Sequence, residues 1–271
     1  MFLQRALITF TLGPIALYLI YLGGWFYFIP LAIILFLATL EYSQIATKIG
    51  WHVPPLLIVP LVILQWVLAQ WPDTALFGPL LLLSLLVITT YALWQYENGR
   101  GHAVPADWFA TFAGLILFGW ICGHFFRLRG LPDMDWQWTM LAMLSTWIAD
   151  SGAYLVGRFV AGRGIVGKHA LSPRLSPNKT VEGFVGGIVL GTLFTVLISL
   201  LLGIAPGQAL LLGLLVSTLG TIGDLGISLL KREAGVKDSG NLFPGHGGAL
   251  DRIDSLMWTV AIAYYLARVF L

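Results

Sequence analysis

The feature that most restricts the fold of this chain is a series of long apolar stretches distributed over its whole length. A helix of about 20 mostly apolar residues can cross the hydrocarbon core of a bilayer. Nine such stretches are present, and only Gly23 and Gly24 separate the first from the second, which predicts a hairpin there. The nine stretches lie near residues 6–22, 25–41, 53–71, 75–95, 108–126, 136–156, 181–203, 207–230 and 252–270. The sequence therefore predicts an all-α, polytopic transmembrane bundle of about nine spanning helices.

Composition agrees with a membrane protein and excludes several kinds of site. Of the 271 residues, 58% are hydrophobic and 10% are charged, whereas soluble domains carry about 25% charged residues. A single cysteine, Cys122, excludes an internal disulfide and a zinc site built from several thiolates. The formal net charge of +2 does not indicate nucleic-acid binding. No Walker A sequence marks a P-loop nucleotide site.

The basic residues predict how the helices are oriented. If the N-terminus lies in the cytoplasm, only Arg127, Arg129 and Arg268 of the 15 Lys and Arg residues fall on the outer side. An excess of basic residues on the inner side is typical of membrane proteins. The first apolar run is longer than the roughly 7–15 residues of the apolar region in a signal peptide, so we interpret it as a span.

Polar residues are distributed unevenly between the two halves of the chain. Residues 1–135 are mostly spans and spacers, and we expect them to form a scaffold that also supplies dimer contacts. Residues 136–271 hold most of the polar side chains, and we expect them to form the catalytic transmembrane region. The absence of an internal repeat argues against an inverted-repeat transporter.

Two carboxylates are predicted to lie in or at the end of spans. Asp150 falls in the sixth stretch and Asp224 in the eighth. A charge at the centre of a span costs at least roughly 2.5–3.5 kcal/mol, so such residues are candidates for function. The alternative is a helix end that already lies in water, and for Asp150 the two interpretations are equally supported.

A polar stripe is predicted on the eighth span. Asp224, Ser228, Lys231 and Arg232 occupy positions i, i+4, i+7 and i+8 and therefore share one helix face. A carboxylate followed by two cations suits a metal ion with phosphates above it. The alternative, basic residues that extend to the interface at a helix end, explains the cations but not Asp224.

The segment that follows contains a glycine-rich turn and two acids. Residues 244–248 read Pro-Gly-His-Gly-Gly, in which glycines would let backbone N–H groups approach an anion. Asp251 and Asp254 then open the last span at i and i+3. They could cap the helix, or they could converge with Asp224 of the neighbouring antiparallel helix. Several oxygen ligands without a Cys or His cluster indicate a hard cation such as Mg²⁺.

A basic loop is predicted after the sixth span, over residues 157–183. Its Lys and Arg residues meet no acid until Glu182, which indicates an anionic ligand or anionic lipid head groups. Positive-inside topology alone would also produce a basic loop, and both interpretations remain open.

Residues 228–254, SLLKREAGVKDSGNLFPGHGGALDRID, resemble the signature of the phosphatidate cytidylyltransferases, also called CDP-diacylglycerol synthases. The pattern is Ser-x-x-Lys-Arg, four residues, Lys-Asp, a Pro-x-His-Gly-Gly turn and Asp-Arg-x-Asp. SPNKTVEG at 176–183 and DSGAYLVGR at 150–158 resemble two upstream blocks of that family. The resemblance covers residues 145–271 by motif.

The resemblance implies a membrane enzyme that uses CTP and a divalent metal to attach CMP to phosphatidic acid, releasing pyrophosphate. Bacterial members lie in the cytoplasmic (inner) membrane, and the family forms homodimers with a polar cavity open to the cytoplasm. Asp224 and Asp251 would hold Mg²⁺, with Asp254 as a further ligand, Asp150 or Asp238 as less certain ones, and room for a second cation.

The resemblance also assigns roles to the remaining polar residues. Lys231 and Arg232 would stabilise the phosphates during catalysis, and His246 would be a phosphate donor, a proton carrier or a turn residue. The residues expected to bind substrate are Ser176, Asn178, Lys179, Thr180, Glu182, Ser228, Lys237, Gly247, Gly248 and Arg252.

Three rival functions are less consistent with the sequence. CTP-dependent polyprenol or phytol kinases resemble this C-terminal region, but the complete Asp-Arg-x-Asp signature favours the cytidylyltransferase. CDP-alcohol phosphatidyltransferases need an Asp-Gly-x-x-Ala-Arg motif that the chain lacks. An ion-coupled transporter would place its polar residues in matched halves, whereas here one half holds most of them.

Overall fold

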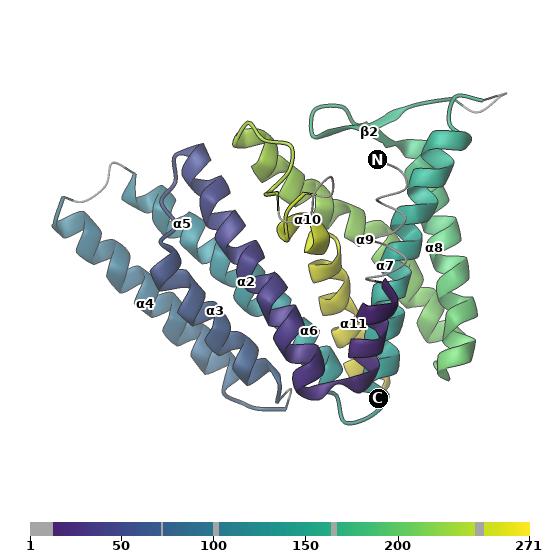
Figure 1. Ribbon diagram of the computed structural model, residues 1–271, viewed down its shortest axis with the longest axis horizontal. Helices are drawn as coiled ribbons and strands as arrows, with labels where there is room; N and C mark the ends of the chain where they lie inside the picture. The colour runs from purple at the N-terminus through teal and green to yellow at the C-terminus, as the bar shows by residue number, and fades with distance from the viewer. Residues whose placement is uncertain (1–12, 72, 100–102, 164–166, 242–246) are drawn as a thin grey trace. The chain divides into compact units, whose positions relative to one another are not determined.

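The fold is described by a computed structural model that covers residues 13–71, 73–99, 103–163, 167–241 and 247–271 (Figure 1). Two of the sequence predictions concern residues outside these ranges. The beginning of the first expected span and the turn residues 244–246, including His246, lie outside the described ranges.

Each of the nine apolar stretches coincides with helix in the described ranges. The helices are Gly13–Leu22, α2 (Gly24–Ile49), α3 (Pro55–Ala69), α4 (Phe77–Glu97), α5 (Val104–Gly114), the π-helix η1 (Leu115–Ile121), α6 (Cys122–Arg129), α7 (Asp135–Phe159), α8 (Val181–Leu202), α9 (Pro206–Glu233), α10 (Leu250–Ile253) and α11 (Leu256–Phe270). Glycines in the left-handed conformation follow α2 at Gly50 and α8 at Gly203, and each ends its helix.

Six of these segments in the described ranges are long and apolar enough to cross a membrane. They are Gly24–Ile49, Phe77–Glu97, Val104–Arg129, Val181–Leu202, Pro206–Glu233 and Leu250–Phe270. Gly13–Leu22 and Pro55–Ala69 are apolar but shorter. Large apolar side chains such as Leu56 and Leu201 are 94% and 87% exposed, which is suited to lipid rather than water. The chain is an all-α membrane protein, and the number of nine spans stays a prediction.

The chain divides into two compact units, each of which is described by itself. The first comprises Met1–Gly130 and Leu230–Ile253, and the second comprises Leu131–Leu229 and Asp254–Leu271. Helix α9 begins in the second unit and ends in the first.

Aromatic donors hold the helices of the first unit together. The Tyr42 hydroxyl donates to the Ala110 carbonyl at 2.7 Å, and the Trp66 indole N–H donates to the Phe118 carbonyl at 2.7 Å. Both acceptors belong to the helical segment α5–η1–α6, in which the π-turns change the register of backbone pairing. Because these groups are buried, each hydrogen bond satisfies a polar atom that lipid could not.

In the second unit, α7 and α8 pack closely because small residues line their contact. Gly183, Gly187 and Gly191 recur every four residues on α8. A Cβ atom at Gly183 would lie 2.7 Å from the Ala153 carbonyl oxygen, and one at Gly187 would lie 2.9 Å from that of Ala149. Glycine therefore allows the two backbones to approach, as it does in many membrane helix pairs.

A small hairpin precedes α8, in the loop for which the sequence predicted no strand. Strand β1 (Ala170–Ser172) pairs antiparallel with β2 (Ser176–Thr180), with Ala170 opposite Thr180. The Thr180 hydroxyl caps α8 by accepting a hydrogen bond from the Gly183 N–H at 3.0 Å. The hairpin thus fixes Asn178 and Lys179 immediately before the helix.

Candidate active site

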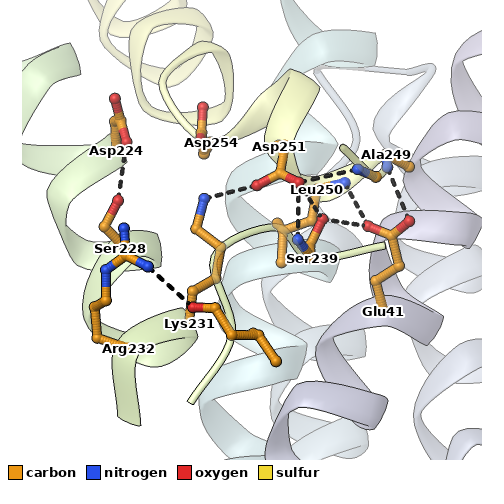
Figure 2. A network of polar contacts seen from close by, with 12 residues as sticks. Glu41, Asp224, Ser228, Lys231, Arg232, Ser239, Ala249, Leu250, Asp251 and Asp254 are labelled. Carbon is orange, nitrogen blue, oxygen red and sulfur yellow. Dashed lines mark hydrogen bonds and ion pairs between the residues drawn. The ribbon is translucent and has the colours of Figure 1, made fainter. Parts of the chain in front are cut away.

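Asp251, at the start of α10, is a heavily hydrogen-bonded carboxylate of the first unit. Its Oδ1 accepts from the Lys231 ammonium at 2.6 Å, and both side chains are only 9% exposed. Its Oδ2 accepts from the backbone N–H groups of Ser239 at 2.8 Å and Gly248 at 2.9 Å. The Ser239 hydroxyl also lies 2.9 Å from Oδ2. Figure 2 shows these contacts converging on one side chain.

Glu41 on α2 is a second buried carboxylate of this network, and it lies outside all of the sequence motifs described above. Its Oε1 accepts from the Ala249 N–H and its Oε2 from the Leu250 N–H, both at 2.9 Å (Figure 2). The Ser239 hydroxyl lies 2.7 Å from Oε2. The residue is 8% exposed. Its sequence signal is weak, because it is an acid at the edge of the apolar stretch 25–41, where contact with water is also expected.

The glycines of the signature make room for these carboxylates. A Cβ atom at Gly248 would overlap both carboxylate oxygens of Glu41, and one at Gly240 would lie 2.5 Å from Oε1. Gly247 has φ +77°, and a Cβ there would overlap Oδ2 of Asp251. The N–H groups of residues 248–250 therefore bind the chain's own carboxylates. The sequence predicted that N–H groups of residues 244–248 could approach an external anion; of these, the Gly248 N–H faces Asp251, and residues 244–246 lie outside the described ranges.

Asp224 on α9 is the corresponding carboxylate of the second unit. Its Oδ2 forms an ion pair with the Lys179 ammonium of β2. Its Oδ1 accepts from the Ser228 hydroxyl one helical turn later, at 3.3 Å. The side chains of Lys179 and Asp224 are 30% and 24% exposed. The structure thus joins residues from two of the sequence motifs, which lie 45 positions apart.

Asp150 on α7 and Asp254 in the turn between α10 and α11 belong to the same unit. The Ser255 hydroxyl donates to Oδ2 of Asp150 at 3.3 Å, and the Ser255 N–H donates to Oδ1 of Asp254 at 2.8 Å. Nearby, the hydroxyls of Thr146 and Thr259 lie 2.8 Å apart and connect α7 with α11. Both acids thus accept hydrogen bonds from Ser255, immediately before α11.

The other predicted residues lie at more exposed positions. Arg232 donates to the Val236 carbonyl at 3.2 Å. Glu182 accepts from the backbone N–H of His169 at 3.1 Å and contacts its ring Nδ1 at 2.6 Å, which connects α8 to the hairpin. The exposed residues are Asn178, Arg232, Lys237, Asp238 and Arg252, and Ser176 is partly buried.

The donor atoms of this set suit a hard cation. Asp224 and Asp251 offer carboxylate oxygens, with a serine hydroxyl beside each, and such oxygens are the ligands that Mg²⁺ prefers. Each carboxylate has a lysine ammonium as its counter-ion. Within the described ranges, three or more His, Cys, Asp or Glu side chains are nowhere gathered closely enough to hold a metal by themselves.

Comparison with known proteins agrees with these motifs. A model of the cytidylyltransferase family matches residues 3–270. A phosphatidate cytidylyltransferase of Synechocystis is 32% identical over an alignment that covers 96% of this chain and 95% of the relative. One from Bacillus subtilis is 39% identical over 73% of this chain and 68% of the relative. Because the family model matches nearly the whole chain, this protein belongs to the cytidylyltransferase family.

Proposed function

We propose that this chain is a phosphatidate cytidylyltransferase, which converts CTP and phosphatidic acid to CDP-diacylglycerol and pyrophosphate. The observation that carries this conclusion is the alignment of 96% of the chain with a relative of that name at 32% identity. The complete Asp-Arg-x-Asp signature at residues 251–254 also supports it.

The reaction is a phosphoryl transfer in which one bond forms and one breaks. A phosphate oxygen of phosphatidic acid attacks the α-phosphorus of CTP, and the bond from that phosphorus to the β-phosphate oxygen breaks. The attacking phosphate is already ionised near neutral pH, so no strong general base is required. The protein has to orient two anionic substrates and neutralise their charge.

We propose that Asp224 and Asp251 hold Mg²⁺, with Asp254 as a further ligand and Asp150 or Asp238 as outer partners. A second cation would also suit an in-line displacement. Bound Mg²⁺ would neutralise negative charge on the nucleotide phosphates. The carboxylate oxygens of these two residues, each with a serine hydroxyl beside it, support this assignment.

The cations next to these carboxylates are suited to binding the phosphates. Lys179 and Lys231 are the counter-ions of Asp224 and Asp251, so phosphates that approach either carboxylate would come within reach of an ammonium. We assign Arg232, Lys237 and Arg252 to the same anionic substrates because all three are exposed at the ends of the helices that carry the carboxylates or in the connecting segment. Ser176, Asn178 and Thr180, on the strand that carries Lys179, would line the nucleotide site.

Membrane location follows from the substrates. The acyl chains of phosphatidic acid would stay in the bilayer while its head group meets CTP at the surface. We propose nine spans, an N-terminus and an active site that face the cytoplasm, a homodimer, and residence in the bacterial cytoplasmic membrane. The distribution of basic residues and the bacterial relatives support this arrangement.

The test is to incubate the protein, purified in detergent, with phosphatidic acid, Mg²⁺ and CTP that is labelled in the α-phosphate. We expect label in the lipid phase, and we expect none after chelation by EDTA. CTP labelled in the γ-phosphate should leave the lipid unlabelled. Transfer of the γ-label would instead show a lipid kinase, and transfer of neither label would refute the function.

A further inference from the structure

Glu41 is the buried acid that the proposed reaction does not use. It lies on α2, and its hydrogen-bond partners lie 198 to 209 residues further along the chain. These partners are the backbone and one side chain of the segment that leads into Asp251. Among the described residues, the hydrogen bonds of Glu41 go to this segment, so its carboxylate fixes the backbone next to a proposed metal ligand.

The contacts of Glu41 require a carboxylate rather than a side chain of the same shape. Each of its two oxygens faces a backbone N–H, at Ala249 and at Leu250. Glutamine has one acceptor oxygen and one NH₂ group, which can only donate. In either orientation its NH₂ group would face one of these N–H groups, and a buried donor would lose its partner.

Ser239 connects Glu41 to Asp251. Its hydroxyl lies 2.7 Å from Oε2 of Glu41 and 2.9 Å from Oδ2 of Asp251. A hydroxyl carries one proton, so it donates to one of these oxygens at a time. Its backbone N–H also donates to Asp251, which keeps Oδ2 turned towards the loop. The other oxygen, Oδ1, is thereby directed to Lys231.

We propose that Glu41 is a positioning residue for Asp251. By fixing residues 239–250, its carboxylate sets the orientation in which Asp251 presents Oδ1 to a cation. The close fit of Gly240 and Gly248 to the Glu41 carboxylate supports this role, because any side chain at those positions would displace it. The inference rests on the proposed function in one respect, the assignment of Asp251 as a metal ligand.

The test compares Glu41→Gln with the wild-type protein, with Mn²⁺ as a spectroscopic probe of the metal site. Free and bound Mn²⁺ are distinguished by electron paramagnetic resonance, which needs no turnover. We expect Mn²⁺ affinity and kcat each to fall about 10- to 100-fold, the usual effect of removing a group that orients a metal ligand. Glu97→Gln makes the same chemical change at the exposed end of α4 and should leave both unchanged.

A second variant keeps the test informative if Glu41→Gln does not fold. Ser239→Ala removes the hydroxyl between the two carboxylates, and we expect it to weaken Mn²⁺ binding. Ser43→Ala, on the same helix as Glu41, removes a hydroxyl that donates only locally to Thr39 and should have no effect. If both single variants fold, the fold-loss of Mn²⁺ affinity in the double variant should be smaller than the product of the two single fold-losses, because both changes act through Asp251.

Wild-type Mn²⁺ affinity in folded Glu41→Gln, or in Ser239→Ala where the first variant is unfolded, would overturn the inference. Failure of the proposed function would give a different result, because the wild-type protein itself would then transfer no label from CTP to the lipid. If Asp251 is not a metal ligand, a third result is expected, because Asp251→Asn would then bind Mn²⁺ with wild-type affinity.

Discussion

Lys231 and Asp251 form an ion pair of 2.6 Å between side chains that are each only 9% exposed. The four groups around Asp251 differ in kind: one is a charged ammonium, two are backbone N–H groups and one is a hydroxyl. Removal of the lysine would leave the carboxylate with three donors, whereas removal of the carboxylate would take an acceptor from all four groups. The two deletions are therefore expected to differ in their effect on stability.

We predict that Lys231→Met reduces cytidylyl transfer by about 100-fold or more, as loss of a preorganised cation or donor does in other active sites, while the protein stays folded. Asp251→Asn should abolish transfer and also lower the free energy of unfolding by about 3–5 kcal/mol, since Asp251 is the shared acceptor of the buried ammonium and of three further donors. Label transfer and thermal unfolding in detergent measure the two effects. Lys48→Met, at an exposed site on α2, is the control. Equal destabilisation by Lys231→Met and Asp251→Asn would contradict this interpretation.

Asp224→Asn should abolish transfer with little change in folding. Its ion pair with Lys179 is partly exposed, and water can solvate the ammonium once the carboxylate is removed. Asp133→Asn, at an exposed position before α7, should keep wild-type activity. Wild-type activity in Asp224→Asn would remove this residue from the metal site.

Gly248→Ala tests whether the loop glycines serve the carboxylates. The added Cβ would overlap both oxygens of Glu41, so we expect a loss of activity and a lower melting temperature. Gly226→Ala is the matched control, because a Cβ there meets nothing within 4 Å and the position is helical. Alanine should stabilise that position by roughly 0.5–1 kcal/mol. Unaltered activity and melting temperature in Gly248→Ala would show that the loop can move away from Glu41.

Gly187→Val should separate α7 from α8. Its Cβ would lie 2.9 Å from the Ala149 carbonyl oxygen, and overpacking of this kind costs about 1–3 kcal/mol. Thermal unfolding of the purified protein measures the loss. Gly207→Val places the same side chain where nothing lies within 4 Å and should be tolerated. Equal melting temperatures in the two variants would contradict the close approach of these helices.

The sequence predicted the helices well because burial in lipid leaves a strong local signal. The stretch expected at 181–203 is the helix Val181–Leu202, and the stretch at 136–156 lies within Asp135–Phe159. The hairpin Ala170–Thr180 was not predicted because its strands are short, are interrupted by Pro177 and lack an alternating apolar pattern. The π-turns of Leu115–Ile121 have no comparable signature in an apolar run.

Glu41 shows why part of the site could not be found in this way. The expected span ended at residue 41, and the polar residues Ser43 and Gln44 follow, whereas α2 continues to Ile49. An acid at the apparent end of a span suggests contact with water. Its actual partners, Ser239, Ala249 and Leu250, are about 200 positions away, so no local pattern could indicate them. The signature at 228–254 was identified by resemblance, but it did not reveal this distant acid.

The distance along the chain between Glu41 and Ala249, 208 positions, also bears on the order of biosynthesis. The ribosome delivers helix α2 to the bilayer long before the loop that will satisfy its carboxylate. Until then the acid has to be hydrated, be protonated or find a temporary donor, because an unmatched charge is costly in lipid. Insertion of the final helices would therefore complete both the catalytic loop and the burial of α2, and nascent chains arrested before that point should be preferred targets of membrane proteases.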